Sequence, residues 1–142
     1  MTPWLVDTGP VVAYLDPDDP MHERASAAFD SESRTLWTTM PVITEAMYLL
    51  RTSPAACANL VGFLRDCRAN IEAFSSFEEL DRVVALMAKY RDLPMDFADA
   101  SGVALAERLE IYDVLTTDER GFRVFRTARN KWFHLVLDGF SG

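Results

Sequence analysis

Trp4-Leu5-Val6-Asp7-Thr8 reads as a short buried strand that ends on a carboxylate. The chain continues with Gly9 and Pro10, and a polar cap with proline near a helix start is typical of a turn from strand into helix. No cation lies within two residues of Asp7. An ionised carboxylate in an apolar setting is costly unless something compensates its charge. Asp7 therefore needs a partner from elsewhere in the chain.

Three further stretches place acids at the edges of apolar elements in the same way. They are Ile43-Thr44-Glu45-Ala46, Met95-Asp96-Phe97-Ala98-Asp99-Ala100-Ser101 and Val114-Leu115-Thr116-Thr117-Asp118. Glu45, Asp96 and Asp99 have no cation within two residues, whereas Asp118 has Arg120. Acids that lie far apart in sequence but share this setting point to one shared cation, and a metal ion is the simplest choice.

Strand-like and helix-like segments alternate along the chain. We expect strands at 4–6, 35–39, 71–74, 113–116, 122–125 and 132–137, and helices at 8–15, 22–29, 41–50, from 54, from 76 and at 95–109. This order predicts an α/β fold with a mainly parallel sheet. Sites in such sheets lie outside the carboxyl ends of the strands. Asp7 and Asp118 both follow predicted strands.

Composition narrows the class of protein. A chain of 142 residues, 49% hydrophobic and 25% charged, is expected to form one domain. No apolar run is long enough for a membrane span and no signal peptide is evident, so we expect a cytoplasmic protein with no membrane association. Cys57 and Cys67 lie about 15 Å apart along one predicted helix, too far for a disulfide. No Cys/His pattern predicts zinc.

The net charge of −8 argues against a broad basic face for nucleic acid, but the charge is uneven. Between residues 120 and 137 the chain has no acid and five cations: Arg120, Arg123, Arg126, Arg129 and Lys131. These residues can hold a polyanion near a metal, which makes them candidate RNA contacts. They can equally form a solvated basic edge strand.

Each acid also has a structural interpretation. Asp7 and Asp96 can cap helices, Glu45 can sit in a first helical turn, and Asp118 can stabilise a turn. Asp99 is the hardest to explain in this way, because it falls among apolar residues inside a predicted helix. The aromatic residues Trp37, Tyr48, Phe63 and Phe97 are expected in the core, and His22 and His134 are expected to be structural.

If the acids do gather, their chemistry is specific. Hard oxygen ligands without His or Cys favour Mg²⁺ or Mn²⁺ over zinc. Such a site can activate water for displacement at phosphorus. Thr8 and Thr116 or Thr117 can orient the acids by hydrogen bonding.

These motifs together resemble PIN domains, including the VapC-type toxins of bacterial toxin–antitoxin pairs. The likeness runs from Val6-Asp7-Thr8-Gly9-Pro10 through Thr44-Glu45-Ala46 and Asp96-Phe97-Ala98-Asp99-Ala100 to Thr116-Thr117-Asp118. It implies a single domain over 1–142 with a three-layer α/β/α fold. It also implies Mg²⁺- or Mn²⁺-dependent cleavage of single-stranded or structured RNA, leaving a 5′-phosphate and a 3′-hydroxyl. An antitoxin partner follows from the toxin role, and we expect a homodimer.

The resemblance assigns roles to individual residues. Asp7, Glu45, Asp99 and Asp118 match the four acidic positions and are the expected catalytic and metal-binding residues, with Asp96 as an auxiliary ligand. The chain departs from the pattern at Gly121, where many relatives carry an aspartate, and this weakens the case for a second metal. Two other functions stay open: a non-catalytic PIN-like interaction module, and a small-molecule phosphohydrolase on the same metal site. The basic segment mildly favours a polymer substrate.

Overall fold

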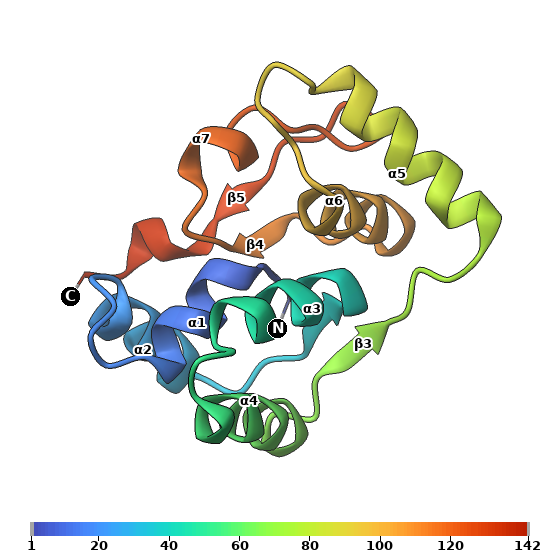
Figure 1. Ribbon diagram of the computed structural model, residues 1–142. Helices are drawn as coiled ribbons and strands as arrows, with labels where there is room; N and C mark the ends of the chain where they lie inside the picture. The colour runs from blue at the N-terminus through green and yellow to red at the C-terminus, as the bar shows by residue number, and fades with distance from the viewer. Residues whose placement is uncertain (1, 142) are drawn as a thin grey trace.

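A central sheet of five strands, in the order β3-β2-β1-β4-β5, organises the computed structural model, which describes residues 2–141 (Figure 1). In chain order the elements are β1 Trp4–Val6, α1 Thr8–Leu15, α2 His22–Ser31, β2 Leu36–Thr39, α3 Met40–Leu49, α4 Pro54–Asp66, β3 Asn70–Glu72, α5 Phe77–Lys89, α6 Phe97–Leu109, β4 Asp113–Leu115, α7 Glu119–Phe122, β5 His134–Leu135 and the 3-10 helix η1 Val136–Gly139. All strand pairs in this sheet are parallel.

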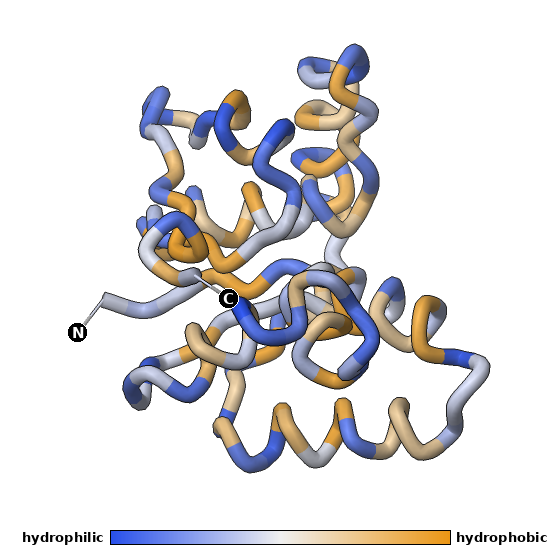
Figure 2. Tube along the Cα trace, turned by 90° about the vertical axis from the view of Figure 1, so that its left-hand side faces the viewer, coloured by the Kyte–Doolittle hydropathy of each residue, from blue (hydrophilic) through white to orange (hydrophobic). Residues whose placement is uncertain are grey.

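Helices cover both faces of the sheet, so the predicted three-layer α/β/α fold is confirmed. Strand β1 shows how the layers arise, because successive side chains of a strand point to opposite faces. Leu5 packs into the cluster formed with α5, α6 and α7, whereas Trp4 and Val6 pack against α1, α2, α3 and α4. Figure 2 shows the hydrophobic strands running through the middle of the molecule, with hydrophilic turns at its periphery.

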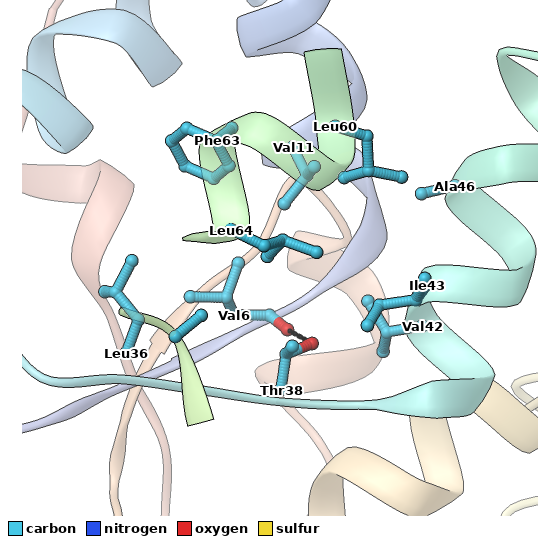
Figure 3. Close-up of a pocket in the computed structure, with 11 residues that line it drawn as sticks. Val6, Val11, Leu36, Thr38, Val42, Ile43, Ala46, Leu60, Phe63 and Leu64 are labelled. Carbon is cyan, nitrogen blue, oxygen red and sulfur yellow. Dashed lines mark hydrogen bonds between the residues drawn. The ribbon is translucent and has the colours of Figure 1, made fainter. Parts of the chain in front are cut away.

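Packing under α4 is slightly loose. Leu60 is the only fully buried residue of this helix, and it lies with Phe63 and Leu64 over Val6 and Val11 (Figure 3). The space left between them is about 10 Å³, close to the size that one water molecule needs. Its walls are apolar, so this gap belongs to the core.

The order of the strands reverses between β1 and β4. From β1 the chain builds β2 and β3 to one side, then crosses back to place β4 and β5 on the other side. Open α/β sheets bind ligands at such a switch point, outside the carboxyl ends of the strands. Asp7 directly follows β1, and Thr116 directly follows β4.

The prediction of a strand at 122–125 is wrong. Phe122 ends the short helix α7, and Phe125 lies in the turn that follows. Both rings are fully buried in one cluster, with their centroids 5.1 Å apart. Residues three apart in a strand point to opposite faces, whereas a helical turn brings them to the same side. The requirement to bury both rings therefore selects the turn.

Three other predicted boundaries shift. The strand expected at 132–137 joins the sheet only at His134–Leu135 and continues as η1. The backbone carbonyls of Leu137 and Phe140 accept hydrogen bonds from the Arg24 guanidinium at the end of this helix. Strand β3 ends at Glu72, before Phe74 with its positive φ of 55°. Helix α6 begins at Phe97, two residues later than expected, because Asp96 caps it.

Within the described residues, none of the helices is both long and apolar enough to cross a membrane. Cys57 and Cys67 are free thiols, as the spacing along α4 predicts.

Candidate active site

Asp7 is held at the switch point by a short chain of hydrogen bonds. Its backbone N–H donates to Leu115 O at 2.9 Å, which joins the ends of β1 and β4. The Thr116 hydroxyl donates to Asp7 Oδ2 at 2.7 Å, and the Asp118 N–H donates to Thr116 Oγ1 at 2.9 Å. Thr116 is buried, so the predicted orienting role for this residue rests on a direct contact. The segment 116–118 thereby sets the direction of the Asp7 carboxylate.

Two glycines permit this close approach of segments. A methyl group at Gly9 would overlap the side-chain hydroxyl of Thr117, so Thr117 packs against α1 only because residue 9 lacks a side chain. At Gly121 a methyl group would overlap Asp118 Oδ2 and lie 2.8 Å from Phe125 Cζ. The Gly121 N–H also donates to Asp118 Oδ1 at 3.0 Å. Gly121, the departure noted in the sequence, thus has a structural reason.

Asp96 and Asp99 form a reciprocal cap at the start of α6. The Asp99 N–H donates to Asp96 Oδ1 at 2.8 Å, and the Asp96 N–H donates to Asp99 Oδ2 at 3.2 Å. Asp99, the acid that was hardest to explain structurally from the sequence, lies in the first turn of α6 and occupies the third helical position of this capping box. The Asp96 carboxyl also contacts the carboxyls of Asp99 and Glu45, so the cap lies against the other acids.

Glu45 reaches the same region from the opposite side. It lies in the second turn of α3, which starts at Met40, so the explanation by a first-turn helix dipole fails. The Thr8 hydroxyl is buried and has no hydrogen-bond partner within the described residues. It approaches Glu45 and lowers the pKa of that carboxyl. A buried hydroxyl without a partner beside an acid is the kind of atom that a bound ligand or water satisfies.

The pKa values confirm that the acids share one environment. Burial, mainly, raises the pKa of Asp7 to about 6, and nearby Asp118 and Asp96 raise it further, against the hydrogen bond from Thr116. Burial also raises the pKa of Asp99 to about 8, followed by the charges of Asp7 and Asp96. Burial and the contact with the Asp96 carboxyl raise the pKa of Glu45 to about 7. Asp7, Glu45 and Asp99 are therefore each influenced by Asp96, and Asp118 acts on Asp7.

The donor set fits a divalent metal. It consists of carboxylate oxygens, which select Mg²⁺ or Mn²⁺, and the causes of the raised pKa values include no compensating cation. Across residues 2–141, however, no three acidic, histidine or cysteine side chains already surround a single point where a metal could bind. Binding would therefore need the carboxylates to turn inward, and the charge of the bound ion would offset their mutual repulsion.

Residues that the sequence did not single out place α6 against the sheet. The hydroxyls of Thr39 and Ser101 share a hydrogen bond of 2.7 Å, and Ser101 also donates to Ala98 O at 2.8 Å. Both side chains are fully buried. This contact joins the end of β2 to α6 two residues after Asp99, so it holds the start of α6 against the sheet.

The basic segment lies in turns rather than in an edge strand. Arg123 pairs with Asp138 at 3.0 Å, Arg129 pairs with Glu110 at 3.3 Å, and Arg126 stacks on the Trp132 ring. Glu110 ends α6, roughly 20 Å along the helix from Asp96. Arg129 therefore lies far from the acids. Within residues 2–141, the side chains of Arg120 and Lys131 have no ion pair or hydrogen bond.

Comparisons with known proteins place this site in context. No family model matches the chain. The chain is 30% identical over 134 residues to Ribonuclease VapC26 of Mycobacterium tuberculosis, covering 93% of this chain and 98% of that protein. Its fold is similar to the crystal structure of M. tuberculosis VapC20, a sarcin-ricin loop cleaving toxin, with a TM-score of 0.74 over 82% of this chain and 90% of that one, at 19% identity.

The raised pKa values predict how stability depends on pH without metal. The folded protein holds protons on Asp7 and Asp99 between pH 4 and their folded values of about 6 and 8, whereas the unfolded chain, with pKa values of 3.8, releases them. The free energy of unfolding should therefore fall as pH rises through this window. In the presence of a chelator, we expect a lower melting temperature at pH 8.5 than at pH 5.5. Asp99→Asn should flatten this dependence.

Asp81→Asn on α5 is the matched control, because it removes the same charge from an exposed position. It should leave the slope unchanged. A melting temperature that stays constant or rises with pH in the wild type would show that these acids are not desolvated together.

Proposed function

The chain belongs to the VapC-type PIN-domain family, and from this premise we propose that it is a metal-dependent endoribonuclease acting as the toxin of a toxin–antitoxin pair. The observation that carries the proposal is the gathering of Asp7, Glu45, Asp99 and Asp118 at the switch point without a compensating cation. The proposed substrate is single-stranded or structured RNA, which places the activity in the cytoplasm.

The four acids, with Asp96 as an auxiliary group, would hold Mg²⁺ or Mn²⁺. Such an ion supplies a Lewis acid that stabilises charge at phosphorus and lowers the pKa of an attacking water. Thr116 keeps the Asp7 carboxylate directed at the site, and Gly121 does the same for Asp118 through its backbone N–H. The reciprocal cap fixes Asp96 and Asp99 relative to α6. The chain's own contribution is thus to hold oxygen donors in fixed positions.

Two other functions compete with this proposal. The hydrogen bonds that Asp96 and Asp118 make to helix N-termini are compatible with a non-catalytic PIN-like module, because they give two acids a structural role. They do not account for Asp7 and Glu45, whose side chains cap no helix. A small-molecule phosphohydrolase would need no basic segment, and the unpaired Arg120 and Lys131 favour a polymer.

Substitution of the acids tests the nuclease. Asp7→Asn and Asp99→Asn should each abolish Mn²⁺-dependent cleavage of labelled RNA while leaving the metal-free melting temperature unchanged or higher, because each removes a repelling charge. Millimolar Mn²⁺ should raise the melting temperature of the wild type, since a ligand at a hundredfold excess over its dissociation constant adds about 2.7 kcal/mol to stability.

The Asp7/Asp99 double variant should show no such increase, and Asp81→Asn should behave as the wild type. Equal Mn²⁺ shifts in the wild type and the double variant would end the shared-site proposal. A large loss of stability with cleavage retained would show instead that these acids are structural.

We propose that the basic segment contacts the RNA backbone, with Arg120 and Lys131 as the side chains free to do so. Each phosphate contact releases counterions and steepens the salt dependence of binding. Arg120→Gln with Lys131→Gln should weaken RNA binding and flatten its dependence on salt, with the cleavage site unchanged. Arg129→Gln is the control, because Arg129 already pairs with Glu110. An unchanged slope in the double variant would place the RNA path elsewhere.

Protein partners follow from the toxin role. We propose a cognate antitoxin, because a toxin needs a partner that restrains it, and we propose a homodimer. Exposed apolar side chains on α5 support a protein interface, since Phe77 is 86% exposed and Val84 is 64% exposed. Light scattering should give a dimer mass for the wild type and a lower mass for Phe77→Ser with Val84→Ser. A monomer at all concentrations would contradict the homodimer.

A further inference from the structure

A groove of about 590 Å³ opens directly beside the candidate active site, between α3 and the start of α6. It shares two acids with that site, Glu45 and Asp96. Its other lining residues are mostly apolar: Met40, Pro41, Thr44, Tyr48, Ala73, Phe74, Leu80, Phe97 and Ala98. Its size falls within the range of pockets that bind small organic groups. A substrate held by Glu45 and Asp96 would therefore lie against this groove.

The walls of the groove carry aromatic side chains that the protein leaves exposed. Met40, Thr44 and Tyr48 follow one another at intervals of four along α3, so they share one face of the helix. Phe97, the first residue of α6, lines the groove beside Asp96. Tyr48 is 55% exposed and Phe97 is 40% exposed, so the expectation that both lie in the core is wrong.

The turn between β3 and α5 lines the groove with Ala73 and Phe74, and its backbone conformation is unusual. Phe74 has a φ of 55°, a left-handed conformation that is rare for a bulky residue. Its ring is nonetheless buried, at 6% exposure, in the cluster that includes Val83 and Leu86. This turn between β3 and α5 sets Phe74 and Ala73 beneath the groove. The floor is therefore fixed by the core rather than by a mobile loop.

Charge decides what kind of group the groove can hold. Its lining includes two carboxylates and no lysine, arginine or histidine, so a phosphate placed inside would be repelled. A neutral, flat and apolar group meets no such penalty. A cation stands outside the lining, where the Arg51 guanidinium lies 3.9 Å from the centre of the Tyr48 ring. The arrangement suits a nucleotide whose base enters and whose phosphate stays at the rim.

We propose that this groove holds an unpaired base of the RNA substrate, stacked against Tyr48 and Phe97, next to the bond that is cut. The proposal rests on the proposed ribonuclease function. Sequence-tolerant binding of single strands commonly combines base stacking on aromatic rings with cations along the backbone. RNA is also read mainly where its bases are unstacked in loops and single strands. The groove would thus explain a requirement for single-stranded or looped RNA at the cleavage site.

Fluorescence of 2-aminopurine tests the position of the base directly. The probe is placed at successive positions of a short single-stranded RNA that the wild type cleaves, or of any short RNA if none is cut, and binding is followed with chelator present. One position beside the cleavage site should change its fluorescence on binding. Tyr48→Ala and Phe97→Ala should abolish this change and weaken binding roughly 5- to 100-fold. Tyr48→Phe, which keeps the ring, should retain it.

Val61→Ala on α4 removes an exposed apolar side chain outside the groove and is the control, with folding checked by thermal melting. If the wild type cleaves RNA but the Tyr48→Ala and Phe97→Ala variants match Val61→Ala in fluorescence and KM, the base pocket is wrong. If the two variants change the mass of the protein in light scattering instead, the groove is an interface between copies, and the proposal is overturned. If the wild type cleaves no RNA, the proposed ribonuclease function is rejected. The fluorescence would still report whether a base binds in the groove.

Discussion

The crowding of acidic side chains around the buried Asp7 is the constraint on which the rest of this structure depends. Asp7 sits where β1 and β4 end, and Asp99 and Glu45 approach it from α6 and α3. The raised pKa values of Asp7, Glu45 and Asp99 mean that ionising all of them together is unfavourable in the metal-free protein. The fold nevertheless holds them in place with a hydrogen bond from Thr116, a reciprocal cap at α6 and a buried contact between Thr39 and Ser101.

The same elements that concentrate the acids also shape the space beside them. Helix α3 carries Glu45 toward the acids and, three residues later, Tyr48 toward the groove. Helix α6 begins with Asp96 at the acids and Phe97 at the groove. The acids of the candidate site and the apolar groove beside it therefore come from nearby residues of the same two helices. The spacing between them is set by helix geometry.

Much of the site could be predicted from the sequence because its acids mark the ends of elements. Asp7 and Asp118 follow strands whose apolar runs are easy to recognise, and a parallel sheet brings such ends together. The role of Asp99 was harder, because a capping box depends on where the helix begins, and that boundary moved by two residues. The turn at Phe122–Phe125 was missed because its alternating pattern fits a strand, and only the shared burial of both rings decides between them. The exposure of Tyr48 and Phe97 depends on how α3, α5 and α6 meet, which no local pattern reports.

The contact between Gly9 and Thr117 has a consequence for how this sequence can change over time. The two positions lie more than a hundred residues apart, yet the space that one leaves is filled by the hydroxyl of the other. A side chain at position 9 becomes admissible only after position 117 has become smaller, so the order of the two changes matters. Evolution at these positions therefore depends on the order of the substitutions. Relatives that carry a larger residue at one position should carry a smaller one at the other.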